Sequence, residues 1–236
     1  MITLAIDSSS KAATAALIKD GALLGEITLN DKKEHSTILM TLIEDLLKFN
    51  KLSISDIDGY VVSKGPGSFT GLRIGMATIK GLSFGSNKPY VSISSLDALA
   101  YNVVNFDGII CPVMDALRNS VYTALYKTEN NKLKRLTEYD ALNLEDLISL
   151  LKEKNKKVIF IGDGVNKYKD YLEENYPNCC FPPAHLNLTR ASSLGELGST
   201  LLKAGQYDDS NSGPIYLKKS QAEREYEQRM QLKNEC

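Results

Sequence analysis

The stretch from Ser63 to Gly75, SKGPGSFTGLRIG, contains the residue types of a phosphate-binding loop. Glycines let the backbone approach an anion closely, and the start of a following helix favours negative charge. The spacing misses both standard phosphate motifs by one residue. Gly67 and Gly71 are too close together for a Walker A loop, and Gly71 comes too late for a dinucleotide fingerprint. The same pattern is typical of a tight strand-to-helix turn in which Ser68 or Thr70 caps the helix.

Side chains suited to acid–base, nucleophilic or metal chemistry are sparse. The two histidines are His35 and His185, whereas a metallopeptidase helix needs two histidines four residues apart, and position 39 is a leucine. Ser68 stands between Gly67 and Phe69, which is not the G-x-S-x-G pattern of a hydrolase nucleophile. We therefore predict no catalytic residue and no metal site in this chain.

The composition is that of an ordinary globular protein of one large domain or two small ones. The chain has 236 residues, of which 43% are hydrophobic and 24% charged, and a net charge of −1 argues against a free-standing nucleic-acid binder. The cysteines form no C-x-x-C pair, so we expect reduced thiols. No run of apolar residues is long enough for a membrane span, and the N-terminus predicts a core strand rather than a signal peptide. We expect a cytoplasmic protein with no membrane partner.

Hydrophobic periodicity predicts that three strands, a helix, a strand and a helix occur twice. In the first half we expect strands at residues 2–7, 12–18, 22–29 and 59–63, helices at 36–50 and 70–84, then a strand at 90–93 and a helix at 95–104. In the second half we expect strands at 108–115, 120–127, 132–139 and 157–161 and helices at 144–154, 165–175 and 192–204.

This repeat predicts a duplicated α/β architecture with two lobes, each a mixed sheet flanked by helices. Its plan resembles the actin-like/Hsp70-like (ASKHA) fold of actin, Hsp70 and the sugar kinases. We assign residues 1–106 to an N-terminal lobe, residues 107–217 to a C-terminal lobe and residues 218–236 to a charged tail.

In that fold group the first hairpin of each lobe holds phosphate with an acid and glycines. Here the two turns begin with Asp7 and Asp115 but contain no glycine, so the backbone cannot approach a phosphate as closely. The alternative is that each acid is simply a turn or capping residue. We predict a weak nucleotide-binding set made of Asp7, Ser8, Gly65, Gly67, Ser68 and Asp115.

The two helices of the first half carry more apolar surface than one sheet can cover. In the helix at 36–50 the apolar side chains span an arc of roughly 200°, whereas a helix on one sheet needs about 100°. The helix at 70–84 is apolar almost all round and contains three glycines, which could allow a second helix to approach closely. Burial in the chain's own core is the alternative. We predict a partner interface formed by Leu39, Leu42, Ile43, Leu46, Gly71, Leu72, Arg73, Gly75, Met76 and Ile79.

Five segments carry a resemblance to a known family. GPGSFTGLRIG, LAIDSSS, HSTILMTLIEDLL, PVMDALRNSVYTALY and PIYLKK occur in the order and spacing of the TsaB (YeaZ) family, which the chain resembles over most of its length. The resemblance implies the two-lobed actin-like fold. It also implies that the helices near His35 and Thr70 are dimerisation helices.

The resemblance further implies a non-catalytic subunit. Such a subunit is required with a TsaD-type catalytic subunit to make N6-threonylcarbamoyladenosine at position 37 of tRNAs that read codons starting with A. A TsaE-type ATPase joins the complex, tRNA is met only through the complex, and the isolated chain forms a homodimer. No cofactor is tightly bound, although ATP or ADP is possible within the complex. The alternatives are an ATP-dependent small-molecule kinase on the same fold and a peptidase-like relative.

Overall fold

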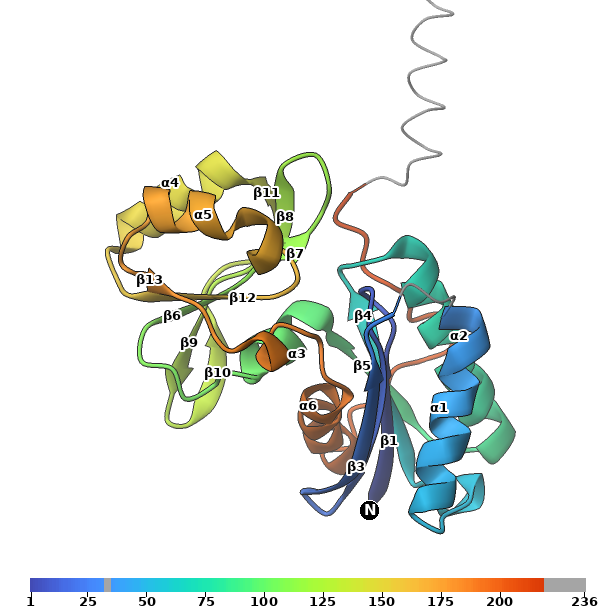
Figure 1. Cartoon of the computed structure of the whole chain (residues 1–236). Coiled ribbons are helices and arrows are strands. Elements are labelled where there is room, and N and C mark those ends of the chain that lie inside the picture. Colours follow the sequence, from blue (N-terminus) through green and yellow to red (C-terminus); the bar gives the residue numbers. More distant parts are fainter. Residues whose placement is uncertain (32–34, 219–236) are drawn as a thin grey trace, which may run out of the picture.

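The computed structural model describes residues 1–31 and 35–218, and it contains two five-stranded sheets with helices around them (Figure 1). The first sheet has the order β3-β2-β1-β4-β5. Strand β1 pairs antiparallel with β2 and parallel with β4, so this sheet is mixed. Its strands are β1 (Ile2–Asp7), β2 (Ala13–Lys19), β3 (Ala22–Leu29), β4 (Gly59–Gly65) and β5 (Tyr90–Ser94).

The second sheet repeats this topology, with the order β10-β9-β6-β12-β13. Strand β6 pairs antiparallel with β9 and parallel with β12, as β1 does with β2 and β4. The predicted duplication of a two-lobed α/β fold is therefore confirmed. The strands are β6 (Ile109–Pro112), β9 (Tyr126–Glu129), β10 (Lys132–Arg135), β12 (Val158–Ile161) and β13 (Cys179–Cys180).

The first hairpin of the second lobe differs from the expectation of two continuous strands. The run at 108–115 is divided at Val113, and the run at 120–127 is divided at residues 124–125. The two outer pieces, β7 and β8, join a further strand, β11, in a separate three-stranded sheet of order β11-β8-β7, so the tip of this hairpin leaves the main sheet. The strands of this small sheet are β7 (Met114–Asp115), β8 (Ser120–Thr123) and β11 (Asp140–Asn143).

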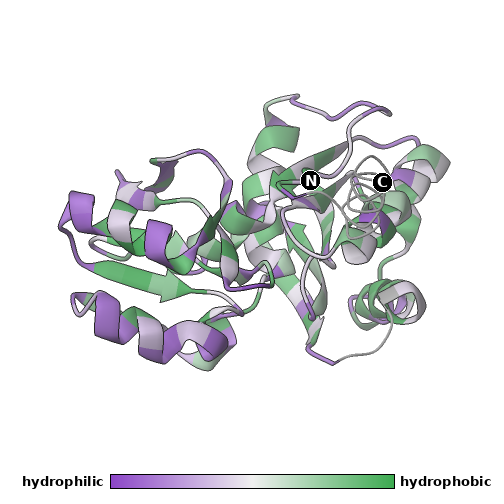
Figure 2. Cartoon of the chain, turned by 90° about the horizontal axis from the view of Figure 1, so that it is seen from above, coloured by the Kyte–Doolittle hydropathy of each residue, from purple (hydrophilic) through white to green (hydrophobic). Residues whose placement is uncertain are grey.

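The helices cover the sheets on defined faces. Helices α1 (His35–Phe49) and α2 (Phe69–Ser86) cover one face of the first sheet, and α4 (Leu144–Lys154) and α5 (Val165–Asn175) cover one face of the second (Figure 1). In the second lobe the central strands β6 and β12 consist of apolar residues. The ribbons of its helices alternate between hydrophobic and hydrophilic colours (Figure 2), as expected for helices with one buried side. Two short 3-10 helices, Ile54–Asp56 and Ala184–Leu186, lie in the connections.

Helices α3 (Ser95–Tyr101) and α6 (Ala191–Lys203) lie between the two sheets (Figure 1). Although α6 follows the second lobe in sequence, it packs on the free face of the first sheet. Gly195 and Gly198 make this close packing possible, because a Cβ there would lie 2.1 Å from Ile18 and 2.4 Å from Val61. The predicted division at residues 106 and 107 places α6 in the C-terminal lobe, whereas its packing partners are strands of the first sheet. The order of elements along the chain suggested placing α6 with the second lobe. The free face of the first sheet is apolar, however, and α6 packs there because it buries that face.

None of the helices in the described ranges is long and apolar enough to cross a membrane. The charged tail predicted from residue 218 onward lies outside these ranges except for Lys218.

Candidate functional site

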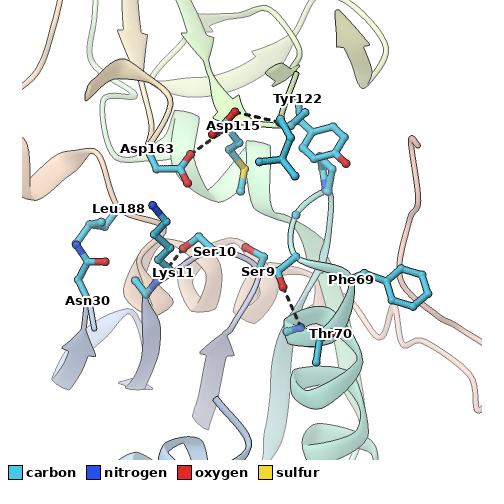
Figure 3. A pocket seen from close by; sticks show the side chains of 18 of the residues that line it. Ser9, Ser10, Lys11, Asn30, Phe69, Thr70, Asp115, Tyr122, Asp163 and Leu188 are labelled. Atoms are coloured by element: carbon cyan, nitrogen blue, oxygen red, sulfur yellow. Dashed lines mark hydrogen bonds between the residues drawn. The ribbon is translucent and has the colours of Figure 1, made fainter. Parts of the chain in front are cut away.

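A cleft of about 1270 Å³ lies between the two lobes. It is lined from the first lobe by the β1–β2 turn and the start of α2, and from the second lobe by the β7–β8 turn and the start of α5. Residues 215–218 line it as well. Figure 3 shows Lys11 pointing from the first lobe toward the side of the cleft that carries Asp163.

Asp7 at the end of β1 and Asp115 at the end of β7 act in the same way. The Asp7 carboxylate accepts a hydrogen bond from the backbone N–H of Ser9 at 2.5 Å, and that of Asp115 accepts from Leu117 N–H at 3.0 Å. Each is an Asx turn, in which the side chain stabilises the bend that follows it. At both positions the acid is thus a turn residue, which the sequence analysis gave as the alternative to phosphate binding.

The GPGS loop is packed against the β1–β2 turn. Ser68 N–H donates to the carbonyl of Ser9 at 2.6 Å. A Cβ on Gly67 would lie 2.2 Å from the same carbonyl oxygen, so only glycine fits. Ser8 Oγ donates to the Gly71 carbonyl at 2.8 Å, and Ser68 Oγ caps α2 by accepting from Gly71 N–H. The glycines of this loop therefore hold the start of α2 against the chain's own first turn.

The GDG segment at residues 162–164 is the counterpart in the second lobe. Gly164 N–H donates to the carbonyl of Val113 at 3.0 Å. A Cβ on Gly162 or Gly164 would lie 2.5 or 2.7 Å from that oxygen. In both lobes, glycines thus serve close packing of one loop on the neighbouring turn.

Charged groups of the second lobe gather on one wall of the cleft. Lys167 Nζ lies 3.1 Å from both carboxylate oxygens of Asp115. Hydrogen bonding to Tyr168 and to Asp115 raises the pKa of Lys167. Burial raises the pKa of the Asp163 carboxyl, although the N–H of Asp115 donates to it at 3.1 Å. This wall therefore consists largely of charges that bind one another.

Three of the six predicted nucleotide residues, Gly67, Ser68 and Asp115, line the cleft. Asp7 and Ser8 are buried behind the first turn, and Gly65 is buried at the end of β4. The cleft also contains residues that the sequence analysis did not single out, such as Lys11, Asp163 and Lys167. Lys11 follows the DSSS turn directly, and Asp163 is the central residue of GDG, so both could have been found by their positions after the equivalent strands.

The predicted partner residues lie mainly in the core of this chain. Of the ten, nine are buried and Arg73 alone is exposed. The leucines and isoleucine of α1 pack on β1, β2 and α2 in one cluster. Gly75 faces Ser8, whose Oγ would lie 2.6 Å from a Cβ. The apolar arc of α1 is buried within this chain because α1 contacts the sheet and α2 together, which is the alternative that the sequence analysis gave. That these two helices meet a partner stays a prediction.

The exposed ridge of α2 consists of other residues. Phe84 is 92% exposed, and Phe49 at the end of α1 is 75% exposed. Ala77 is exposed, and a Cβ on Gly81 or Gly85 would have open space among the described residues. We call Ala77, Gly81, Phe84 and Gly85 the α2 ridge. Helical spacing of Phe84 from Ala77 and Gly81 could have identified it in the sequence.

No group of three or more histidine, cysteine, aspartate or glutamate side chains that could hold a metal ion is found within residues 1–31 and 35–218. Cys111 is a buried free thiol in the second sheet, and Cys179 and Cys180 are half-buried free thiols.

Two sheets of the same strand order, with a cleft between their first hairpins, define the chain as a protein of the actin-like ASKHA fold class. Solved structures share this fold: YeaZ from Pseudomonas aeruginosa is 22% identical, with a TM-score of 0.74 over 91% of this chain and 100% of that chain. The activator of 2-hydroxyisocaproyl-CoA dehydratase from Clostridium difficile, solved with ADPNP, is 15% identical, with a TM-score of 0.51 over 90% and 100%.

The sequence comparisons are more specific. A family model described as TsaD, tRNA N6-adenosine threonylcarbamoyltransferase, matches residues 22–226. The tRNA threonylcarbamoyladenosine biosynthesis protein TsaB of Bacillus subtilis (strain 168) is 37% identical over 74% of this chain and 76% of its own length. TsaB of Escherichia coli (strain K12) is 28% identical over 74% and 77%. The chain belongs to the TsaB (YeaZ) family of tRNA threonylcarbamoyladenosine biosynthesis proteins, which confirms the resemblance.

Proposed function

We propose that this chain is a non-catalytic subunit, required with a TsaD-type subunit for N6-threonylcarbamoylation of adenosine 37 in tRNAs that read codons starting with A. The observation that carries the proposal is the α2 ridge, where Phe84 stands almost fully exposed beside small residues. An exposed large apolar side chain forgoes about 1.5–3 kcal/mol of burial, which a partner surface can recover.

The ridge suits a partner helix. Ala77, Gly81 and Gly85 keep the surface low, so another helix can approach, and Phe84 supplies an aromatic anchor of the kind that dominates interfaces. We propose that the TsaD-type subunit packs here in the complex and that a second copy of this chain does so when the chain is isolated. A TsaE-type ATPase joins this complex, which we place in the cytoplasm. The chain contacts tRNA only as part of the complex.

The isolated chain is proposed to catalyse no reaction. The carboxylates of Asp7 and Asp115 are engaged by their own turns, and Lys167 is paired with Asp115, so few of these groups are left to act on a substrate. No tightly bound cofactor is proposed. ATP or ADP in the complex would be held weakly in the cleft, with Lys11 and the start of α2 as the nearest favourable groups for phosphate.

The test is reconstitution of tRNA modification with purified components. A TsaC-type enzyme, which makes threonylcarbamoyl-AMP, is combined with a TsaD-type protein, a TsaE-type ATPase and tRNA, with and without this chain. We expect modified adenosine only when the chain is present and co-purification of the chain with the TsaD-type protein. Full modification without the chain would contradict the proposal.

The second candidate function is an ATP-dependent small-molecule kinase, which the volume of the inter-lobe cleft favours. ATP turnover by the pure chain that disappears on Asp115→Asn would support it. Turnover at background is the result we expect.

A further inference from the structure

The chain after α6 crosses from one lobe to the other without forming a helix or strand. Residues 204–218 start beside the first sheet, pass along α2 and end at the second lobe, on the cleft side of the molecule (Figure 1). Helices α3 and α6 connect the lobes elsewhere, between the sheets. We call residues 204–218 the strap.

The strap is fixed to the first lobe along its length. Asp208 N–H donates to the Tyr90 carbonyl at 2.9 Å, and Tyr90 OH donates to the Asp209 carbonyl at 2.5 Å. Lys80 Nζ donates to the carbonyl of Ser210 at 2.8 Å. Farther along, Ile215 N–H donates to the carbonyl of residue 64 at 2.7 Å. An irregular segment with this many long-range bonds is held in one path rather than left to vary.

An aromatic and cationic cluster anchors the strap where it reaches the cleft. The ring of Tyr216 lies 4.7 Å from that of Phe69, and the guanidinium of Arg73 lies 4.0 Å above the Phe69 ring. Arg73 Nε also donates to Tyr216 OH at 3.0 Å. Phe69 and Arg73 belong to the first turns of α2, so the strap is tied to the helix that carries the proposed partner ridge.

The end of the strap contacts the opposite lobe. Lys218 Nζ donates to the carbonyl of Ala116 at 3.1 Å, in the β7–β8 turn. The next three residues of that turn, Leu117, Arg118 and Asn119, have φ values of 61°, 53° and 54°. Non-glycine residues rarely adopt this left-handed conformation, and three in succession need support from their surroundings. The Lys218 contact is one such support.

We propose that the strap is a latch that sets how far the two lobes open. Arg73 and Tyr216 form its anchor on the first lobe, and Lys218 with the Ala116 carbonyl forms its catch on the second. Domains joined by limited contacts move relative to one another by default. A contact on the cleft side, away from the helices between the sheets, restrains that motion. Because the anchor is on α2, a partner on the α2 ridge would act on the cleft through the strap.

The experiment compares the full chain with Tyr216→Ala, Lys218→Ala and Lys218→Arg, using Tyr207→Ala as the matched control. Tyr207 is an exposed tyrosine of the same strap, before it reaches α2. Hydrogen–deuterium exchange is followed in peptides that cover residues 114–122, and the radius of gyration is measured by X-ray scattering. Thermal melting of each variant checks that it is folded.

We expect Tyr216→Ala and Lys218→Ala to accelerate exchange at residues 114–122 by about tenfold, which is the effect of losing one hydrogen bond that closes a turn. Both variants should also have a larger radius of gyration than the parent chain. Lys218→Arg and Tyr207→Ala should resemble the parent. Unchanged exchange at residues 114–122 in both alanine variants would overturn the proposal. Equal acceleration in the strands of both sheets would overturn it too, since the strap would then only stabilise the fold.

Discussion

Glycines of α2 that look equivalent in the sequence have different surroundings in the structure. Gly75 faces the first turn of the chain, whereas Gly81 faces open space among the described residues. The helix accepts glycine at both positions, but the reason differs. At Gly75 a side chain would collide with Ser8, and at Gly81 its absence leaves the ridge low for a partner. This pair gives a matched comparison of packing within the chain and packing with a partner.

Gly81→Leu should leave the fold intact and abolish capture of the TsaD-type protein. Replacing a helix glycine stabilises the helix by some tenths of a kcal/mol to about 1 kcal/mol, while the new side chain blocks the ridge. Gly75→Leu should instead lower the free energy of unfolding by about 1–3 kcal/mol through overpacking. Thermal melting and pull-down are measured for both variants. A Gly81→Leu chain that still binds its partner would contradict the assignment of the ridge.

Cys111 should resist thiol reagents in the folded protein. Burial raises the pKa of its thiol to about 12, so little thiolate exists near pH 8. Cys179 and Cys180 are half-buried, and burial raises the pKa of each thiol, so they should react slowly but before Cys111. Mass spectrometry after timed alkylation assigns the order. Early labelling of Cys111 would show that the second sheet opens more readily than its packing indicates.

At the scale of elements, the hairpin of β9 and β10 depends on charge. Glu129 accepts hydrogen bonds from Lys127 at 2.8 Å and Lys134 at 2.6 Å. Hydrogen bonds from Lys127 and then Lys134 lower the pKa of Glu129 to about 2. All three side chains are substantially exposed, so solvent and salt weaken the effect.

The contribution of Glu129 should be lost in acid. A carboxyl group whose pKa is lower in the folded state stabilises it above the unfolded value, here 4.5, and stops doing so as the pH falls toward 2. The melting temperature of Glu129→Gln should therefore lie slightly below that of the parent at pH 7, and the gap should close between pH 4.5 and pH 2. Added salt should narrow the gap at pH 7. A gap independent of both pH and salt would point to packing instead.

At the scale of the whole molecule, the first lobe is completed by a helix from the far end of the chain. Helix α6 covers the sheet face that carries Ala5, Val61 and Ile93. Without α6 that apolar face would meet water. The chain leaves the first lobe and returns to it at neighbouring points, because Asn102 Nδ2 donates to the carbonyls of Leu186 and Leu188, each at 2.9 Å.

Residues 1–106 expressed alone should therefore fail to fold cooperatively. A fragment that joins residues 1–102 through a short glycine linker to residues 187–218 should fold better, since it restores α6 to its sheet. Circular dichroism melting curves of the two fragments are the measurement. A cooperative transition for residues 1–106 alone would show that α6 is dispensable for this lobe.

The sequence by itself determined most of the succession of elements, the duplication of the lobes and the family. It did not predict β11 or β13. Periodicity located nearly every helix and the strands of the first sheet because it reports local alternation of burial. The residue types of the turn before α2 limited the cap to Ser68 or Thr70, and the structure shows Ser68 in this role, through a hydrogen bond that spans three residues. The strands of the first hairpin in the second lobe were predicted less accurately. The break at Val113 lies where the Val113 carbonyl packs against Gly162 and Gly164, which are distant in the chain.

Only the tertiary structure decided which apolar surfaces are covered and by what. The wide arc of α1 is buried because the sheet and α2 meet it from two sides. Helix α6 serves the first sheet, and the GPGS glycines serve the first turn. Each of these facts depends on a contact between residues distant in the chain. A sequence pattern records that a side chain is apolar or absent, but the identity of its neighbour is set by how the whole chain folds.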